Sequence, residues 1–186
     1  MKQKTSVTKI VFIGMLAAVV CVVTFFRFPL LGSKVHFANT MCLLSGLLMG
    51  PVAGGLAAGF GSALYDGLWG GYDFIQCFIT FVSKFAMAWI CAKIAFAGGR
   101  EAKSKGLNAV ACVVGAFSYV ALYMLKTFVY QKFVYGYPAE TVWATMLSKL
   151  PGSLINAVVA LIVAPILYTA ISGALERGGL LRKMRA

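Results

Sequence analysis

The stretch VHFANTMCLLSGLLMGPVAGGLAAGFGSALYDGL, residues 35–68, decides the fold. It is apolar for far longer than one membrane-crossing helix of about 20 residues requires. Gly50 and Pro51 interrupt it, and proline breaks a helix because it lacks an amide donor and clashes with the preceding turn. The stretch therefore predicts a short helix over about residues 37–49, a tight turn, and a second helix over about residues 52–69.

The rest of the chain repeats this apolar pattern. Of the 186 residues, 61% are hydrophobic and only 12% are charged, a composition well beyond that of an ordinary soluble domain. Gly55 and Gly59 lie four residues apart on the second helix of the stretch, a spacing that predicts close contact with another helix in lipid. The sequence thus predicts an all-α integral membrane protein of six transmembrane helices, a single domain over residues 1–186, with the other four helices over about residues 10–26, 74–97, 107–130 and 148–174.

The basic residues predict the orientation. Eleven of the seventeen fall on one side of the six predicted helices, and the positive-inside rule makes that side cytoplasmic, so both termini are expected there. They occur in short clusters between apolar runs rather than as a solvated stripe, which argues against a nucleic-acid partner. The eleven are Lys2, Lys4, Lys9, Lys93, Arg100, Lys103, Lys105, Arg177, Arg182, Lys183 and Arg185.

Several functions are excluded by missing motifs. The chain has no GxxxxGK[ST] loop, so any ATP-driven step belongs to a partner protein. It has one histidine and neither an HExxH nor a GxSxG motif, which argues against a membrane hydrolase. The five cysteines lack CxxC spacing and indicate neither a disulfide framework nor a zinc site. We therefore expect no catalysis, no metal and no cofactor.

A lysine inside an apolar helix is costly unless it faces a cavity or a partner, so such residues are candidates for function. Lys84 lies ten residues into the 74–97 helix, roughly 15 Å along its axis at about 1.5 Å per residue. The i, i+3, i+4 rule places four neighbours on its face: Gln76, Thr80, Ser83 and Met87.

Two more polar stripes lie in the outer half of the predicted bundle. Tyr119, Tyr123 and Lys126 recur at spacings of four and three in the 107–130 helix. Lys149 and Asn156 occur in the outer half of the 148–174 helix, with Ser153 between them. Three helices thus direct donors and aromatic rings to one membrane depth, which predicts an outward-opening pocket for a polar, flat or anionic small molecule.

Other interpretations of these residues stay open. Lys126 and Lys149 lie close enough to the outer interface to extend their ammonium groups into it. Lys84 is alternatively a structural partner of Asp66 or Asp73. The tyrosines alone would also fit an interfacial aromatic belt.

Two further regions are candidates for contact with a ligand or a partner. The loop over residues 29–40 contains His36 and Asn39, and a short following helix leaves space for this loop to cover a pocket. Gly14 and Ala18 form a small-xxx-small face on the first helix, suited to contact with another helix. That helix belongs either to this chain or to a partner.

The chain resembles the S components of energy-coupling factor (ECF) transporters, within them the riboflavin-transporter-like group. The likeness covers the whole chain in size, six predicted helices and basic N-terminus. Its specific residues are an H-x-x-N start, a G-P turn, an aspartate closing the third helix, a lysine in FITFVSKFAMA (residues 78–88) and an asparagine in LPGSLINAVVA (residues 150–160). These are His36, Asn39, Gly50, Pro51, Asp66, Lys84 and Asn156.

The resemblance implies a function. Such proteins capture a vitamin from outside the bacterial plasma membrane by helices 4 to 6 and the first loop. They then dock on a membrane scaffold (T) subunit bound to two ATPase subunits and topple to release the ligand inside. Members often carry an AxxxA docking motif on the first helix, and Gly14 and Ala18 match it with the first alanine replaced.

Two rival functions belong to other classes. A free-standing secondary carrier or channel for a small polar or anionic solute would work without ATPases. A membrane enzyme or assembly factor is the third alternative. Co-purification with a scaffold and two ATPases distinguishes the first reading from these rivals.

Overall fold

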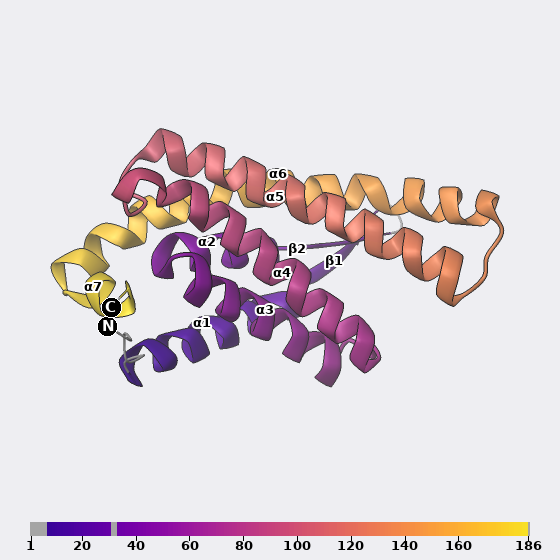
Figure 1. Ribbon diagram of the computed structural model, residues 1–186, viewed down its shortest axis with the longest axis horizontal. Coiled ribbons are helices and arrows are strands. Elements are labelled where there is room, and N and C mark those ends of the chain that lie inside the picture. The colour runs from indigo at the N-terminus through magenta and orange to yellow at the C-terminus, as the bar shows by residue number, and fades with distance from the viewer. Residues whose placement is uncertain (1–6, 31–32, 186) are drawn as a thin grey trace.

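The computed structural model describes residues 7–30 and 33–185 and is almost entirely helical (Figure 1). Lys2 and Lys4, part of the predicted basic N-terminus, lie outside the described residues. A short 3-10 helix at Ala97–Gly99 and a π-helical turn at Tyr130–Val134 flank α5. The other elements are α1 (Val7–Phe25), β1 (Arg27–Leu30), β2 (Ser33–His36), α2 (Ala38–Met49), α3 (Pro51–Leu68), α4 (Phe74–Ala95), α5 (Lys105–Val129), α6 (Ala139–Arg177) and α7 (Leu180–Arg185).

The helices run back and forth along the long axis of the molecule. Figure 1 shows α1 and α3 along one side, α5 and α6 along the other, and α4 between them. Both ends of the described chain lie at the same end of the bundle, where the Lys9 ammonium donates a 3.3 Å hydrogen bond to the Arg185 carbonyl. At the opposite end α5 and α6 extend beyond the other helices.

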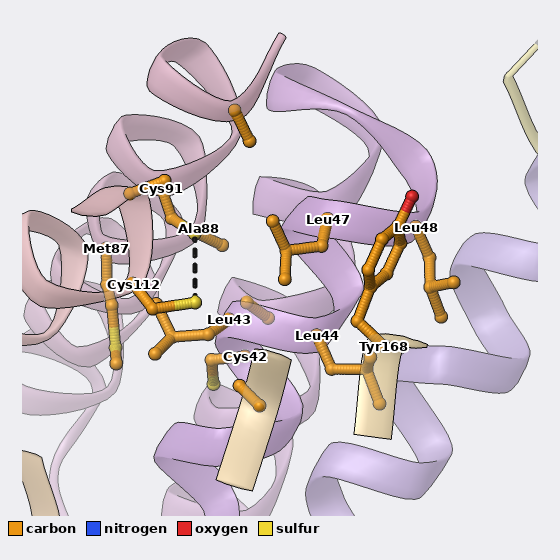
Figure 2. Close-up of a cluster of buried hydrophobic side chains, with 14 of the residues drawn as sticks. Cys42, Leu43, Leu44, Leu47, Leu48, Met87, Ala88, Cys91, Cys112 and Tyr168 are labelled. Carbon is orange, nitrogen blue, oxygen red and sulfur yellow. Dashed lines mark hydrogen bonds between the residues drawn. The ribbon is translucent and has the colours of Figure 1, made fainter. Parts of the chain in front are cut away.

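The central element is α2, which is apolar on all sides and buried along almost its whole length. Figure 2 shows its leucines in contact with side chains from three other helices. Met87 and Cys91 come from α4, Cys112 from α5 and Tyr168 from α6. A helix enclosed in this way sets the positions of all its neighbours, and these neighbours also build the site.

The predicted break between α2 and α3 is confirmed. Gly50 has φ of 84°, a conformation that favours glycine, and Pro51 is the first residue of α3. The two helices then cross in backbone contact, since a Cβ atom at Gly54 would lie 2.5 Å from the Ser45 carbonyl oxygen. This tight corner places the end of α3 beside the end of α1.

The predicted close contact at Gly55 and Gly59 is also observed. A Cβ atom at either position would lie 2.8 Å from an aromatic ring of α4, Phe85 and Phe81 respectively. The absence of side chains at these glycines therefore brings α3 against α4. The polar residues of both helices face one cavity as a result.

The prediction for the last helix, residues 148–174, was wrong at its N-terminal end. Pro151 lies inside α6 rather than in its first turn, and α6 begins nine residues earlier, at Ala139. A membrane-type helix tolerates an internal proline when neighbours stabilise it, and Val142 in the added segment is buried. Lys149 consequently lies ten residues into its helix rather than at its start.

The segment after α1 was predicted as a loop and is a β-hairpin. β1 and β2 pair antiparallel, with Arg27 opposite His36 and Leu30 opposite Ser33. Pairing satisfies the backbone groups of a segment that lies among helices. The predicted helix over 107–130 is α5, which begins at Lys105 and continues through the π-helical turn to Val134.

Four helices among the described residues are long and apolar enough to cross a membrane: α1, α4, α5 with its extension, and α6. The twelve residues of α2 reach only about 18 Å, less than the roughly 30 Å of a bilayer core. The predicted six-span topology therefore stays a prediction.

Candidate ligand-binding site

A cavity of about 330 Å³ lies between the hairpin and the helices around it. Its volume falls near the lower end of the range of small-molecule sites, about 300 to 1,000 Å³. Its wall is polar and aromatic, with Ala38 as the one aliphatic side chain among the described lining residues. The others are Thr24, Arg27, His36, Ser62, Tyr65, Asp66, Tyr72, Thr80, Ser83, Lys84, Tyr119, Tyr123, Lys126, Lys149, Ser153 and Asn156.

Eight of the ten residues predicted to contact a ligand line this cavity: His36, Thr80, Lys84, Tyr119, Tyr123, Lys126, Lys149 and Asn156. The three predicted polar stripes therefore meet. The other two residues lie outside the wall. Asn39 is buried behind it and accepts a hydrogen bond from the Lys84 ammonium. Gln76 donates to the Asp73 carboxylate at 3.0 Å in the N-terminal cap of α4.

Lys84 is held by neutral groups. Besides its hydrogen bond to Asn39, its ammonium nitrogen lies 3.8 Å from the centroid of the Tyr119 ring, a cation–π contact. In the described part of the chain it forms no ion pair within 4.0 Å with Asp66 or Asp73. The alternative of a structural pair with either aspartate is not observed, although Asp66 lines the same cavity.

Two further cations also contact neutral partners. The Lys126 ammonium lies 3.4 Å from the Thr80 hydroxyl oxygen and 5.4 Å from the centroid of the Tyr72 ring. The Arg27 guanidinium lies 5.3 Å from the centroid of the Tyr65 ring. Both positive groups therefore keep hydrogen-bonding capacity that a ligand can use.

The tyrosines form an aromatic face on one side of the cavity. The rings of Tyr119 and Tyr123 stack with their centroids 6.2 Å apart and their planes 25° apart. They come from one face of α5, as their spacing of four predicts. Such a face can hold a flat ring by stacking.

The hairpin forms another part of the wall. The His36 amide donates a 2.8 Å hydrogen bond to the Asn156 side-chain oxygen, which fixes β2 against α6.

The imidazole of His36 is neutral at pH 7. Burial, and then the positive charges of Lys84 and Arg27, lower the pKa of His36 to about 3. Its Nδ1 atom is buried with no hydrogen-bond partner among the described residues. A ligand or an ordered water normally satisfies such an atom.

Sequence reasoning missed several residues of the wall. Thr24 lies in the last turn of α1 and Arg27 is the first residue of β1, while Ser62 lies three residues before Tyr65 on α3. Ser62 and Tyr65 share a face of α3, so the same spacing rule that found the stripes of α4 to α6 could have found this pair, whereas Arg27 lies in the hairpin, where that rule does not apply. Tyr72 lies in the α3–α4 connection and has no periodic signal.

The small face of α1 lies outside the bundle. Gly14 and Ala18 are exposed, and a Cβ atom at Gly14 would have no described heavy atom within 4 Å. The opposite face of α1 packs in the fold, because Ala17 and Val20 are buried against Gly61. The sequence left open whether the helix that packs on Gly14 belongs to this chain or to a partner. Among the described residues, no helix of this chain packs there.

Comparisons with known proteins agree with this architecture. The chain superposes on a solved structure of the S component of a bacterial ECF transporter with a TM-score of 0.70 and 21% sequence identity, over 90% of this chain and 96% of that one. No curated protein matches the chain. Residues 4–173 match the family described as ECF-type riboflavin transporter, S component. That match covers α1 to α5 completely and most of α6, and the chain therefore belongs to the family of ECF-type riboflavin transporter S components, the substrate-binding membrane subunits of ECF transporters.

Proposed function

We propose that this chain captures a vitamin or related micronutrient, riboflavin-like in the broad sense, outside the bacterial plasma membrane and delivers it to the cytoplasm as part of an ECF-type ABC importer. The observation that carries this proposal is the cavity, which combines stacked tyrosines with several cations in a space of small-molecule size. The family supports the same role.

Within this proposal the lining residues have distinct roles. Tyr119 and Tyr123 pack on the ring of the ligand, and Lys84, Lys126 and Lys149 donate to its polar groups. His36 offers its unpaired ring nitrogen. Asn39 and Gln76 act indirectly, since Asn39 orients Lys84 and Gln76 donates to Asp73, the capping residue of α4.

The hairpin is the proposed lid. It joins α1 to α2 and contributes Arg27 and His36 to the cavity wall, and its contact with α6 runs through the Asn156 side chain. Opening it would expose the cavity at the end of the molecule opposite the termini. This direction agrees with capture from outside when the six-span topology places both termini in the cytoplasm.

Energy coupling requires partners in this proposal. The chain has no ATP-binding loop, so a scaffold subunit with two ATPase subunits would drive release. Gly14 and Ala18 form the proposed docking face, because they are exposed and let a partner helix approach the backbone closely.

Two measurements test the proposal. Calorimetric titration of the detergent-purified chain with riboflavin and other vitamins should give saturable binding to one site. Affinity purification from cells that also express an ECF scaffold and two ATPases should recover all four subunits. Vitamin uptake that persists without any ATPase would instead favour a free-standing carrier.

A further inference from the structure

The charges of the cavity wall do not balance. Four basic side chains line it, namely Arg27, Lys84, Lys126 and Lys149, against one carboxylate, Asp66. His36 stays neutral and adds no charge at pH 7. The described wall therefore carries a formal excess of three positive charges.

None of these four cations is neutralised within the described part of the chain. No carboxylate of a described residue lies within 4.0 Å of any of them, and the partners of Arg27, Lys84 and Lys126 are an amide, a hydroxyl and tyrosine rings. At the other end of the bundle the situation differs. There Lys103 and Arg185 each lie 3.8 Å from the Glu101 carboxylate.

An unbalanced cavity of this kind is costly in a membrane protein. Lys84 is only 3% exposed and Lys126 and Lys149 are partly buried, and a buried charge needs a partner of opposite sign or it destabilises the fold. If Asp66 neutralised one cation, three would remain. A negative charge supplied from outside the chain would offset this excess.

We infer that the natural ligand is an anion: a small, ring-bearing molecule with a phosphate or carboxylate group, rather than a neutral vitamin. This rests on the proposed function and narrows its substrate class. The oxyanion binds Lys126 and Lys149, which project from the neighbouring helices α5 and α6 into the half-buried part of the wall. The ring stacks on Tyr119 and Tyr123. An oxyanion accepts hydrogen bonds from more than one ammonium group and also offsets their positive charge, whereas a neutral ligand accepts hydrogen bonds without offsetting the charge.

Matched pairs of vitamins test this inference on the wild-type chain. Riboflavin and riboflavin 5′-phosphate differ by a phosphate, and the pyridine-ring pair nicotinamide and nicotinate differ in that nicotinate carries a carboxylate in place of a neutral amide. Calorimetry at low and high salt gives the dissociation constant of each. In at least one pair the anion should bind about ten- to hundredfold more tightly than its neutral partner. The pair that shows the difference distinguishes phosphate from carboxylate, and high salt should reduce it.

Substitutions test whether the difference in affinity between an anion and its neutral partner arises in the cavity. In the double variant Lys126→Met with Lys149→Met, the affinities of the two members of that pair should differ by no more than about threefold. The reason is that only the anion forms ion pairs with these two ammonium groups. Lys93→Met is the matched control: Lys93 is exposed at the far end of α4 and does not line the cavity. That variant should keep the full difference. Thermal unfolding of each variant checks that the fold is retained.

The outcomes separate the inference from the proposed function. If a neutral member binds at least as tightly as its anion in every pair that binds, the ligand is not an anion, and vitamin capture stands. If an anion is preferred but Lys93→Met removes the preference as fully as the double variant, the preference does not arise in the cavity and the inference fails. If no vitamin or vitamin phosphate binds, the proposed function fails and the inference with it.

Discussion

The Lys84 ammonium lies over the Tyr119 ring, 3.8 Å from its centroid, and donates a hydrogen bond to Asn39. These contacts join α4, α5 and α2 at the inner wall of the cavity. They direct a cation at the cavity while its two protein partners are neutral. Lys84 is therefore the side chain whose removal best separates a role in binding from a role in folding.

Lys84→Met should weaken ligand binding by about ten- to hundredfold, because it removes a charge-assisted hydrogen bond while retaining most of the side-chain volume. Calorimetry measures the affinity. The change also leaves the buried Asn39 oxygen without its donor, which lowers the free energy of unfolding by about 1–3 kcal/mol. Lys84→Met combined with Asn39→Leu removes that unsatisfied oxygen. Unchanged affinity in a folded Lys84→Met variant, or failure of both variants to fold, would make Lys84 a structural residue.

Gly14→Leu or Ala18→Leu should abolish vitamin uptake by cells while ligand binding by the purified chain stays nearly unchanged, since this face of α1 lies outside the bundle. Uptake of labelled vitamin and calorimetry measure the two properties. Gly173→Leu is a matched control on α6, where a Cβ atom also meets no described neighbour. Loss of uptake and binding together would place the α1 face in the fold rather than in docking.

Labelling from outside should reach a cysteine placed at Tyr137, in the α5–α6 connection, and should not reach one placed at Lys103 or Arg182. The reason is that the α5–α6 connection and the termini lie at opposite ends of the bundle. Cys21 and Cys77 are partly exposed and are first changed to serine, whereas the other three native cysteines are buried. Reaction at position 103 from outside intact cells would refute the cytoplasmic assignment.

Ligand affinity should show no step near pH 6.5, because the pKa of His36 is lowered to about 3 in the folded chain. In the unfolded chain His36 takes up a proton below about pH 6.5, so its contribution lowers the free energy of unfolding as pH falls from about 6.5 toward 3. Calorimetry between pH 5 and 8 measures the first effect, and thermal unfolding over the acid range measures the second. His36→Gln is the control for both, and a wild-type step near pH 6.5 that this variant lacks would mean that His36 titrates normally.

Local signals predicted much of this fold. The Gly50–Pro51 break and the small residues of α3 act through backbone geometry, which a short stretch of sequence determines. The start of α6 was missed because Pro151 resembles an N-terminal proline, and only packing of the preceding residues reveals the longer helix. The hairpin was missed because β1 is stabilised by its pairing with β2 and not by an alternating pattern of its own.

The residues of the site also fall into two groups, those that local sequence signals predicted and those that depend on the tertiary fold. The stripes of α4, α5 and α6 follow from helical periodicity, so Lys84, Lys126 and Lys149 could be placed on a common cavity. Arg27 belongs to β1 and Tyr65 to α3, and only the tertiary fold brings them together. The hydrogen bond between Lys84 and Asn39 spans 45 residues, and the sequence offered aspartates as the more obvious partners.

Native mass spectrometry of the gently purified chain tests the central claim most directly, because it detects a bound small molecule and gives its mass. We predict one vitamin or vitamin derivative per chain. Loss of both stacking rings in Tyr119→Ala with Tyr123→Ala should deplete it strongly, while Tyr137→Ala, at an exposed tyrosine outside the cavity, should retain it. A wild-type chain that binds no vitamin after incubation with a vitamin mixture, or a vitamin complex that survives loss of both rings, would contradict the account.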